Sequence, residues 1–243
     1  MNSSQDALAH SYSYIGNELE LFAEAVNWKR YFRSAIADRL VGDVLEVGAG
    51  IGETTRHLLD RQQRSWLCLE PDERLATRLR AWTVSEDFTP RPRVQIGTTA
   101  DVNPRSRFDT ILYIDVLEHI EDDRAEAARA AELLAPHGTL IVLSPAFQQL
   151  FSEFDRSVGH YRRYTRASLA AVMPAALRKV RLRYLDSVGF LASLSNRALL
   201  RQSLPSPRQI AMWDRMMIPA SRVLDPLLAR GFGRSVLAVY ERV

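Results

Sequence analysis

The segment Gly159–Thr165 (GHYRRYT) concentrates side chains that exchange protons or bind anions. It holds one imidazole, two phenols and two guanidinium groups within seven positions. The imidazole suits a general base because its ordinary pKa lies near neutrality. The phenols could orient a substrate, and the guanidinium groups could pair with an anionic group on it. The candidates are His160 and Tyr161 for catalysis, and Arg162, Arg163 and Tyr164 for substrate binding.

A structural role for this segment is also compatible with the sequence. Its arginines could form ion pairs with nearby carboxylates, and such pairs need no ligand. The residues of this alternative lattice are Asp155, Arg156, Arg162 and Arg163. His160 would then simply pack against its neighbours, so the sequence leaves both interpretations open.

A glycine-rich stretch, Glu46–Glu53 (EVGAGIGE), lies between a predicted strand and a predicted helix. Glycines at such a turn let the backbone approach a ligand and direct amide groups at it. A tight turn without any ligand is the alternative. Counting from Gly48 and Gly50, the third glycine position of the dinucleotide pattern is Glu53. A carboxylate at that helix start would repel a pyrophosphate, so the sequence disfavours a nicotinamide dinucleotide.

Acidic and histidine residues follow two further predicted strands. Glu70 ends one strand, where its carboxylate could accept hydrogen bonds from the two hydroxyls of a ribose. Asp115–His119 (DVLEH) follows another. His119 is a second candidate for catalysis, although packing against a ligand or fixing the loop is its favoured role. No cluster of carboxylates and histidines has metal-ligand spacing, so no metal site is expected.

Strand-like and helix-like segments alternate through the first two thirds of the chain and must position these residues. The predicted strands are 43–50, 64–72, 93–99, 108–115 and 138–145. The predicted helices are 52–62, 73–82 and 121–134. Apolar strands separated by helices favour a doubly wound parallel α/β sheet, which binds ligands at the carboxyl ends of its strands. Residues 146–165 leave the fifth strand on that side and end at Thr165, a predicted helix N-cap.

The two ends of the chain have a different character. Residues 1–40 include an amphipathic helical stretch, and a helical insert at 188–233 separates two last strands at 179–186 and 234–243. Aromatic residues of the first segment could line a pocket or belong to the core: Tyr12, Tyr14, Trp28 and Tyr31. The insert mixes methionine and tryptophan with arginine, which suits core packing, an apolar substrate tunnel, a homodimer contact or a membrane-surface helix.

Charge is distributed unevenly along the chain. Residues 1–150 hold 16 basic and 23 acidic side chains, whereas residues 151–243 hold 16 basic and 6 acidic ones. The basic last third favours an anionic partner such as a phosphate, a carboxylate, a nucleic acid or a lipid surface. A single cysteine, the lack of a long apolar run and the lack of a secretory signal indicate a cytoplasmic protein without a transmembrane segment.

Three stretches resemble the successive motifs of class I S-adenosylmethionine-dependent methyltransferases: VLEVGAGIGETT, LEPD and FDTILYIDVLEHIEDD. They cover roughly residues 37–145 in the order typical of that family. The resemblance implies a Rossmann-like sheet of seven mostly parallel strands with an antiparallel last strand. LEHIEDD followed by GHYRRYT also resembles a bacterial subgroup of small-molecule methyltransferases, in which this loop helps to close over the substrate.

Carried over by position, the resemblance implies a site for S-adenosylmethionine. Glu46 and the backbone of Gly48 and Gly50 would hold its methionine part. Glu70 would bind the ribose, and Pro71 would line the adenine. Residues 1–40 would cap the cofactor, and residues 41–243 would form the methyltransferase domain with its acceptor loop at 146–165.

The remaining cofactor residues would lie after the third and fourth strands. Asp115 and Val116 would lie beneath the reactive sulfonium. Many relatives have an acid that contacts the adenine amine where this chain has Thr98. The adenine is therefore expected near Thr98 and Thr99, with Asp101 or a backbone carbonyl in place of that acid.

The expected function is transfer of a methyl group from S-adenosylmethionine to oxygen or nitrogen of a small, anionic or neutral acceptor. One alternative keeps the cofactor but places a lipid-linked or otherwise anionic substrate at a membrane surface. Another is a non-catalytic or nucleic-acid-binding protein that retains the fold. No nucleic-acid partner is expected, because the arginines accompany no recognisable binding module.

Overall fold

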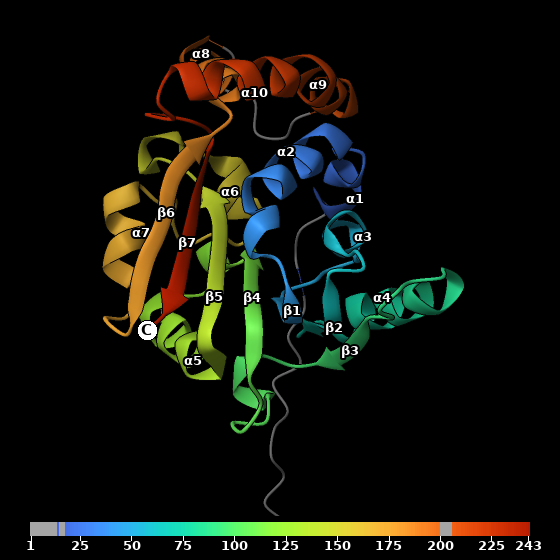
Figure 1. Cartoon of the computed structure of the whole chain (residues 1–243). Helices are drawn as coiled ribbons and strands as arrows, with labels where there is room; N and C mark the ends of the chain where they lie inside the picture. Colours follow the sequence, from blue (N-terminus) through green and yellow to red (C-terminus); the bar gives the residue numbers. More distant parts are fainter. Residues whose placement is uncertain (1–13, 15–17, 200–205) are drawn as a thin grey trace, which may run out of the picture.

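Seven strands form one sheet with helices on both faces in the computed structural model, which describes Tyr14 and residues 18–199 and 206–243 (Figure 1). The strands are β1 (Gly42–Val47), β2 (Gln63–Glu70), β3 (Arg93–Ile96), β4 (Phe108–Ile114), β5 (Leu134–Pro145), β6 (Leu177–Leu185) and β7 (Ser235–Arg242). Their order is β3-β2-β1-β4-β5-β7-β6. Only β7 runs antiparallel to its neighbours. The predicted doubly wound fold with an antiparallel last strand is confirmed.

The helices alternate with the strands along the first two thirds of the chain. The α-helices are α1 (Glu18–Ala23), α2 (Val26–Ile36), α3 (Glu53–Leu58), α4 (Glu73–Ser85), α5 (Asp123–Leu133), α6 (Glu153–Ser157), α7 (Arg166–Val172), α8 (Ser187–Leu199), α9 (Pro207–Met212) and α10 (Ile218–Leu227). Shorter helical turns are η1 (Ala37–Arg39), η2 (Thr99–Asp101), η3 (Leu117–His119), η4 (Gln148–Leu150) and η5 (Trp213–Met217), the last of which is a π turn.

Each face of the sheet has its own hydrophobic core, because successive side chains of a strand point to opposite faces. On one face, Val44 of β1 belongs to a core that includes Phe32 of α2. On the other face, Leu45 belongs to a core that includes Ala130 of α5 and Leu169 of α7. This double covering explains why the strand sequences are almost continuously apolar.

Two element boundaries differ from the sequence prediction by four residues. Helix α3 ends at Leu58, four residues early, because the Asp60 amide donates to Gln63 Oε1 at 2.6 Å as the chain turns into β2. Strand β5 begins at Leu134, directly after α5, because Leu134 pairs with Phe108 before a register shift.

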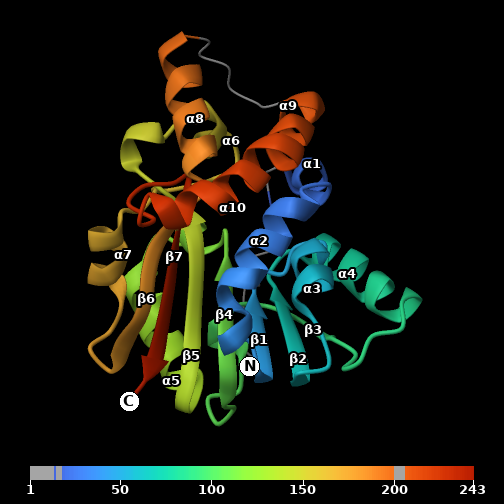
Figure 2. The ribbon, with the colours of Figure 1, turned by 45° about the horizontal axis from the view of Figure 1, so that its top comes forward.

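The helical insertion near the C-terminus is also confirmed, and it lies beyond the carboxyl ends of the parallel strands (Figures 1 and 2). None of the helices in the described part of the chain has the length and hydrophobicity that a bilayer crossing requires.

A buried carboxylate, Asp186, attaches this insertion to the end of β6. Its side chain accepts hydrogen bonds from the Trp213 indole and the Ser221 hydroxyl, both at 2.7 Å, and from the Gly189 amide at 2.9 Å. Asp186 has φ 67°, a left-handed conformation that aspartate tolerates better than most residues. One residue therefore joins η5, α10 and the start of α8.

A second buried carboxylate, Asp225 of α10, connects the insertion to α2. It accepts hydrogen bonds from the backbone amides of Asp186 at 2.7 Å and Ser187 at 3.0 Å, and from the Tyr31 hydroxyl at 2.6 Å. The insertion is thus fixed to both the sheet edge and the N-terminal helices.

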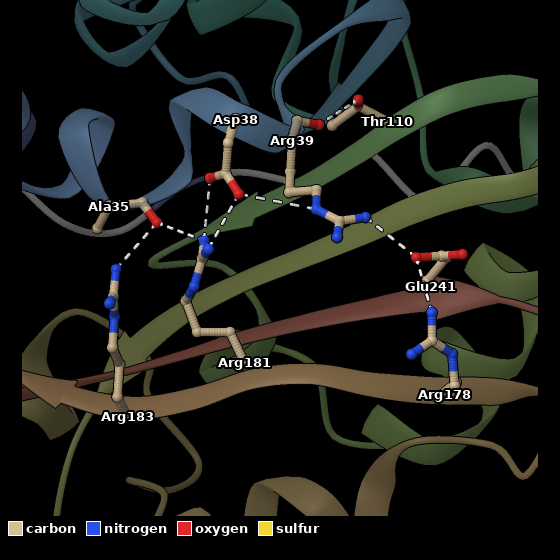
Figure 3. A network of polar contacts seen from close by, with 8 residues as sticks. All are labelled: Ala35, Asp38, Arg39, Thr110, Arg178, Arg181, Arg183 and Glu241. Carbon is tan, nitrogen blue, oxygen red and sulfur yellow. Dashed lines mark hydrogen bonds and ion pairs between the residues drawn. The ribbon is translucent and has the colours of Figure 1, made fainter.

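Arginines of β6 bind the end of α2 (Figure 3). Arg181 donates to the two carboxylate oxygens of Asp38 at 3.1 and 2.9 Å, and to the Ala35 carbonyl at 2.7 Å. Arg183 donates to the same carbonyl at 3.0 Å. The last carbonyls of a helix lack partners within the helix and carry partial negative charge, so these guanidinium groups stabilise its C-terminus.

The same network extends to β7, where Glu241 accepts hydrogen bonds from Arg39 at 3.0 Å and Arg178 at 3.1 Å (Figure 3). Part of the positive charge of the last third of the chain is therefore used to hold the fold together.

We expect the Asp186→Ala variant to lose about 3 kcal/mol of free energy of unfolding, because three buried donors lose their acceptor. Alanine is also strained at a positive φ. Urea unfolding followed by circular dichroism measures this change. The control is Asp87→Ala, at an exposed position before β3, which should change stability by less than about 0.5 kcal/mol. Similar losses in both variants would contradict the anchoring role of Asp186.

Candidate active site

A pocket lies at the carboxyl edge of the sheet, where the candidate residues are expected from the sequence. Its lining includes these predicted residues: Tyr14, Gly48, Gly50, Asp115, His119, His160 and Arg163. It also includes Trp28, one of the aromatic candidates of the N-terminal segment, and Lys29, Phe32, Glu53, Glu118, Phe154, Trp213 and Arg234. The folded chain thus brings together the glycine turn, the end of β4, the loop after β5, the N-terminal helices and the insertion.

The glycine turn after β1 presents its backbone to the pocket. Gly48 and Gly50 have φ values of 67° and 56°, which glycine adopts without strain. A Cβ on Gly48 would lie 2.7 Å from Val116, so only glycine lets the turn approach the end of β4 this closely. The Val116 side chain therefore packs against this turn.

Glu70 lies at the end of β2 and is held beside this turn. Its carboxylate accepts hydrogen bonds from the Gly50 amide at 2.8 Å and the Asp72 amide at 2.9 Å. Burial raises the pKa of Glu70. Glu70 and the following Pro71 are not part of the pocket lining, and their contact with a ribose and an adenine stays a prediction.

Glu46 faces away from the pocket. It is buried under α3, where its carboxylate accepts hydrogen bonds from the Thr55 hydroxyl at 2.6 Å and the Trp66 indole at 2.9 Å. Burial raises the pKa of Glu46 to about 7. The structure therefore gives this carboxylate protein partners instead of an open position next to the methionine part of a cofactor.

Thr98 and Thr99 also lie outside the pocket. The Thr98 hydroxyl donates to Asp101 Oδ2 at 3.0 Å in the turn η2. The Thr99 hydroxyl is buried and donates to Glu126 of α5 at 2.8 Å. The side chains expected near an adenine are thus occupied by local contacts, and only their backbone is left for such a role.

Asp115 and His119 line the pocket after β4. Asp115 has φ 54° and is open to the pocket although protein surrounds it, and this burial raises its pKa to about 6. Burial and the neighbouring His160 lower the pKa of His119 to about 3. The rings of His119 and His160 meet edge to face, with centroids 4.5 Å apart.

Glu118, between them in the turn η3, is a fully buried carboxylate. Neither of its oxygens has a hydrogen-bond partner among the residues that the structure describes. Burial and the nearby Asp115 raise the pKa of Glu118 well above its usual range. The nearest histidine nitrogen is His160 Nε2, 4.0 Å from Oε1.

His160 is held in the pocket by Asp155 of α6. Its Nδ1 donates to Asp155 Oδ1 at 2.9 Å, which leaves Nε2 facing Glu118. Arg163 donates to both oxygens of the same carboxylate, at 2.7 and 2.9 Å. The ion-pair interpretation is therefore confirmed for Asp155 and Arg163, although both Arg163 and His160 also line the pocket.

Three candidates of the same segment lie elsewhere. Tyr164 is buried in the core and donates to Asp123 at 2.7 Å. Arg162 pairs with the same carboxylate at 2.6 Å, while Tyr161 is 52% exposed beneath the Arg162 guanidinium. The structure does not bring these three side chains to the pocket, because Asp123 at the start of α5 binds two of them elsewhere.

The two tyrosine candidates of the N-terminal segment have separate places. Tyr14 lines the pocket, where its amide donates to Asp72 at 2.7 Å and its ring lies 5.9 Å from that of His119. Tyr31 is buried outside the pocket, where its hydroxyl donates to Asp225. Tyr12 lies outside the described residues.

Sequence reasoning missed three charged residues of the pocket: Lys29, Glu118 and Arg234. Lys29 follows the apolar spacing of α2 and donates to the Phe22 and Ala23 carbonyls at 2.7 and 2.9 Å. A lysine on an apolar helix face could have signalled it. Glu118 lies within the stretch Asp115–His119 that the sequence placed after a strand, and this position could have signalled it.

Arg234 directly precedes β7. Because that strand is antiparallel, its start lies at the same edge as the carboxyl ends of the other strands, which could have signalled this residue. The Arg234 guanidinium lies 4.9 Å over the Trp213 ring. Burial lowers the pKa of Arg234, and within the described ranges its side chain has no ion pair within 4 Å.

Comparisons with known proteins identify the central part of the chain. Residues 45–140 match the family described as methyltransferase domain. A ubiquinone biosynthesis O-methyltransferase from Rhodopseudomonas palustris (strain HaA2) is 40% identical over 45 residues, which are 18% of each chain. Ajmaline N-methyltransferase from Rauvolfia serpentina is 25% identical over 187 residues, 75% of this chain and 58% of that protein. The chain therefore spans less than two thirds of the length of either relative.

Among solved structures, the N-methyltransferase NodS from Bradyrhizobium japonicum WM9, in complex with S-adenosyl-L-homocysteine, superposes with a TM-score of 0.57. It is 16% identical, and the match covers 90% of this chain and 87% of NodS. The central part of the chain therefore resembles a methyltransferase domain, and the chain as a whole has the fold of NodS.

Proposed function

We propose that the protein transfers a methyl group from S-adenosylmethionine to oxygen or nitrogen of a small organic acceptor. The observation that carries this proposal is the junction of the Gly48–Gly50 backbone, Asp115 and His160 in one pocket. The glycine turn proposed to bind the cofactor and the cluster around His160 proposed to accept a proton thereby line one cavity. The relatives named above as an O-methyltransferase and an N-methyltransferase support this reaction class.

The cofactor would lie across the turn after β1. The backbone of Gly48 and Gly50 would bind its methionine part, and Asp115 would compensate the positive sulfonium. Glu70 would accept hydrogen bonds from the ribose with the lone pairs that Gly50 and Asp72 leave free, since a carboxylate can accept about four. Glu53 lines the pocket where a pyrophosphate would lie, which disfavours a dinucleotide.

The acceptor would occupy the aromatic half of the pocket. Trp28, Phe32, Phe154 and Trp213 surround this half with apolar surface. An anionic group on the acceptor would pair with Arg234, a half-buried residue whose guanidinium has no ion-pair partner in the described part of the chain. Arg234 thus takes the role that the sequence analysis gave to Arg162 and Arg163.

The reaction is a displacement at the methyl carbon. An acceptor lone pair forms the new bond to carbon as the carbon–sulfur bond breaks, and the sulfonium becomes the neutral thioether of S-adenosylhomocysteine. The acceptor proton would leave through the cluster of His160, His119 and Glu118, with Nε2 of His160 as its acceptor, and then pass to water. Because methyl transfer depends on alignment, the enclosed pocket would supply most of the acceleration.

Glu70→Ala should weaken binding of S-adenosylhomocysteine at least tenfold, because the ribose hydroxyls would lose a charged acceptor worth about 1.5–3 kcal/mol. Isothermal titration calorimetry measures the affinity. Glu73→Ala is the matched control, since Glu73 is an exposed carboxylate at the start of α4. An unchanged affinity in the Glu70 variant would remove the ribose assignment, and binding of a nicotinamide dinucleotide instead would remove the proposed cofactor.

His160→Ala should lower turnover by about 10²–10⁴-fold while cofactor affinity changes little, as expected for a proton-transfer residue. The acceptor is first found by incubating the protein with labelled cofactor and candidate metabolites, and detecting by mass spectrometry the gain of one methylene. His57→Ala, on α3, is the control. A fully active His160 variant would restrict this histidine to packing.

A second candidate function, methylation of a lipid-linked substrate at a membrane surface, is favoured by the outer surface of the insertion. Large apolar side chains are exposed there: Leu191, Leu194, Met212, Met216, Val223, Leu224, Leu227 and Leu228. Exposed arginines accompany them: Arg208, Arg215 and Arg222. Apolar and basic side chains on one helical surface suit the interface of an anionic bilayer.

This alternative predicts that the protein co-sediments with vesicles that contain anionic phospholipid, and that salt weakens the association. Val223→Asp with Leu227→Asp should reduce binding at least tenfold, because side chains that are 66% and 76% exposed would become charged. Val84→Asp on α4, at a side chain 70% exposed, is the matched control. Equal binding by both variants, or no binding by the unchanged protein, would exclude the surface role.

A further inference from the structure

Three side chains of metal-ligating type converge in the pocket: Glu118, His119 and His160. Their ligand atoms all lie within 4.8 Å of one another. Two come from the turn η3 after β4, and the third comes from the loop after α6. No metal site was expected from the sequence, because no cluster of carboxylates and histidines has metal-ligand spacing, and only the folded loop brings His160 to Glu118 and His119.

The unpartnered carboxylate of Glu118 points to a ligand. This side chain is fully buried, and both of its oxygens lack hydrogen-bond partners in the described part of the chain. A buried carboxylate without a partner is strongly destabilising, so most such groups are paired or bind a metal. The nearby amide of Tyr161 donates to the backbone carbonyl of Glu118 and leaves the carboxylate free.

His160 has the outer contact that a metal ligand needs. Its Nδ1 donates to Asp155, which fixes the tautomer in which Nε2 carries a free lone pair. Asp155 is itself held by Arg163 and Ser152. The ring is thereby oriented with its lone pair toward Glu118, the arrangement that a carboxylate and histidine pair gives to a metal ligand.

We propose that Glu118, His119 and His160 bind one divalent transition-metal ion, with Zn²⁺ as the main candidate. Two imidazole nitrogens and one carboxylate suit zinc, whereas Mg²⁺ prefers oxygen ligands. Small side-chain rotations would bring the ligand atoms to bonding distances of about 2.0–2.2 Å.

Three protein ligands leave a coordination position open toward the pocket. On the basis of the proposed function, an acceptor hydroxyl would occupy that position. The ion would favour its deprotonated form, and the proton would leave to water. This role concerns the same cluster that the proposed mechanism uses for proton removal.

The test uses the full chain without a histidine affinity tag, freed of metal by a chelator. Titration calorimetry with Zn²⁺ should give one site per chain, and Co²⁺ should give the visible absorption of a low-coordinate site. Glu118→Gln and His160→Gln should each weaken Zn²⁺ binding more than tenfold. The control is His137→Gln, an exposed residue, which should stay within twofold.

Absence of a stoichiometric site, or an equal loss of affinity in the His137 variant, would overturn the proposal. Circular dichroism of the metal-free variants shows whether each one folds. S-adenosylhomocysteine affinity is measured on the same metal-free proteins. Cofactor binding without Zn²⁺ binding would overturn the metal site alone, and Zn²⁺ binding without cofactor binding would support the metal site and contradict the methyltransferase function.

Discussion

The carboxylate of Asp155 is the interaction on which the pocket depends. It is buried, and it accepts hydrogen bonds from the Ser152 amide and hydroxyl, from Arg163 and from His160. Burial would raise the pKa of Asp155, but the bonds from His160 and Arg163 hold it below the usual range. The charge thus stays in place at neutral pH and closes the loop between α6 and α7 over the end of β4.

A second buried carboxylate, that of Glu118, lines the pocket and has a different environment. Glu118 lies close to His160 but receives no hydrogen bond from the described residues, whereas Asp155 uses both of its oxygens. The carboxylate of Asp155, which shapes the loop, therefore has hydrogen-bond partners. The carboxylate of Glu118, which faces the cavity, has none among the described residues. Asp115 adds a further acid there. Burial raises the pKa of both acids, so a cationic ligand such as a sulfonium would favour their charged forms.

The fold follows from features that are local in the sequence. Apolar runs of strand length, glycines with positive φ such as Gly48, and acidic helix starts are all decided within a few residues. Seven strands and the edge of the sheet that binds ligands were therefore predictable. Among the residues that directly follow strands, Asp115 and His119 line the pocket, whereas Thr98 and Thr99 do not.

The orientation of individual side chains was not predictable in the same way. Glu46 binds Trp66 in the neighbouring strand, and Tyr31 binds Asp225, which is distant in the sequence. Tyr164 binds Asp123 on α5. The orientation of each of these side chains depends on a hydrogen-bond partner that only tertiary packing supplies. For the same reason, the sequence left the loop arginines open between ion pairs and ligand binding.

The positions of the arginines in the fold show how the uneven charge along the chain is used. Those of β6, including Arg181, bind carboxylates and helix carbonyls of the acidic first part, and Arg163 does the same for Asp155. The charge of these arginines is therefore paired with groups inside the fold. Among the described residues, Arg234 and the exposed arginines of the insertion are available to partners. Arg234 is enclosed beside Trp213 and can meet only a molecule that enters the pocket. Arg222 and its exposed neighbours on the insertion can meet only a surface outside it. An anionic acceptor and an anionic interface are thus separate requirements, and the protein could satisfy either one without the other.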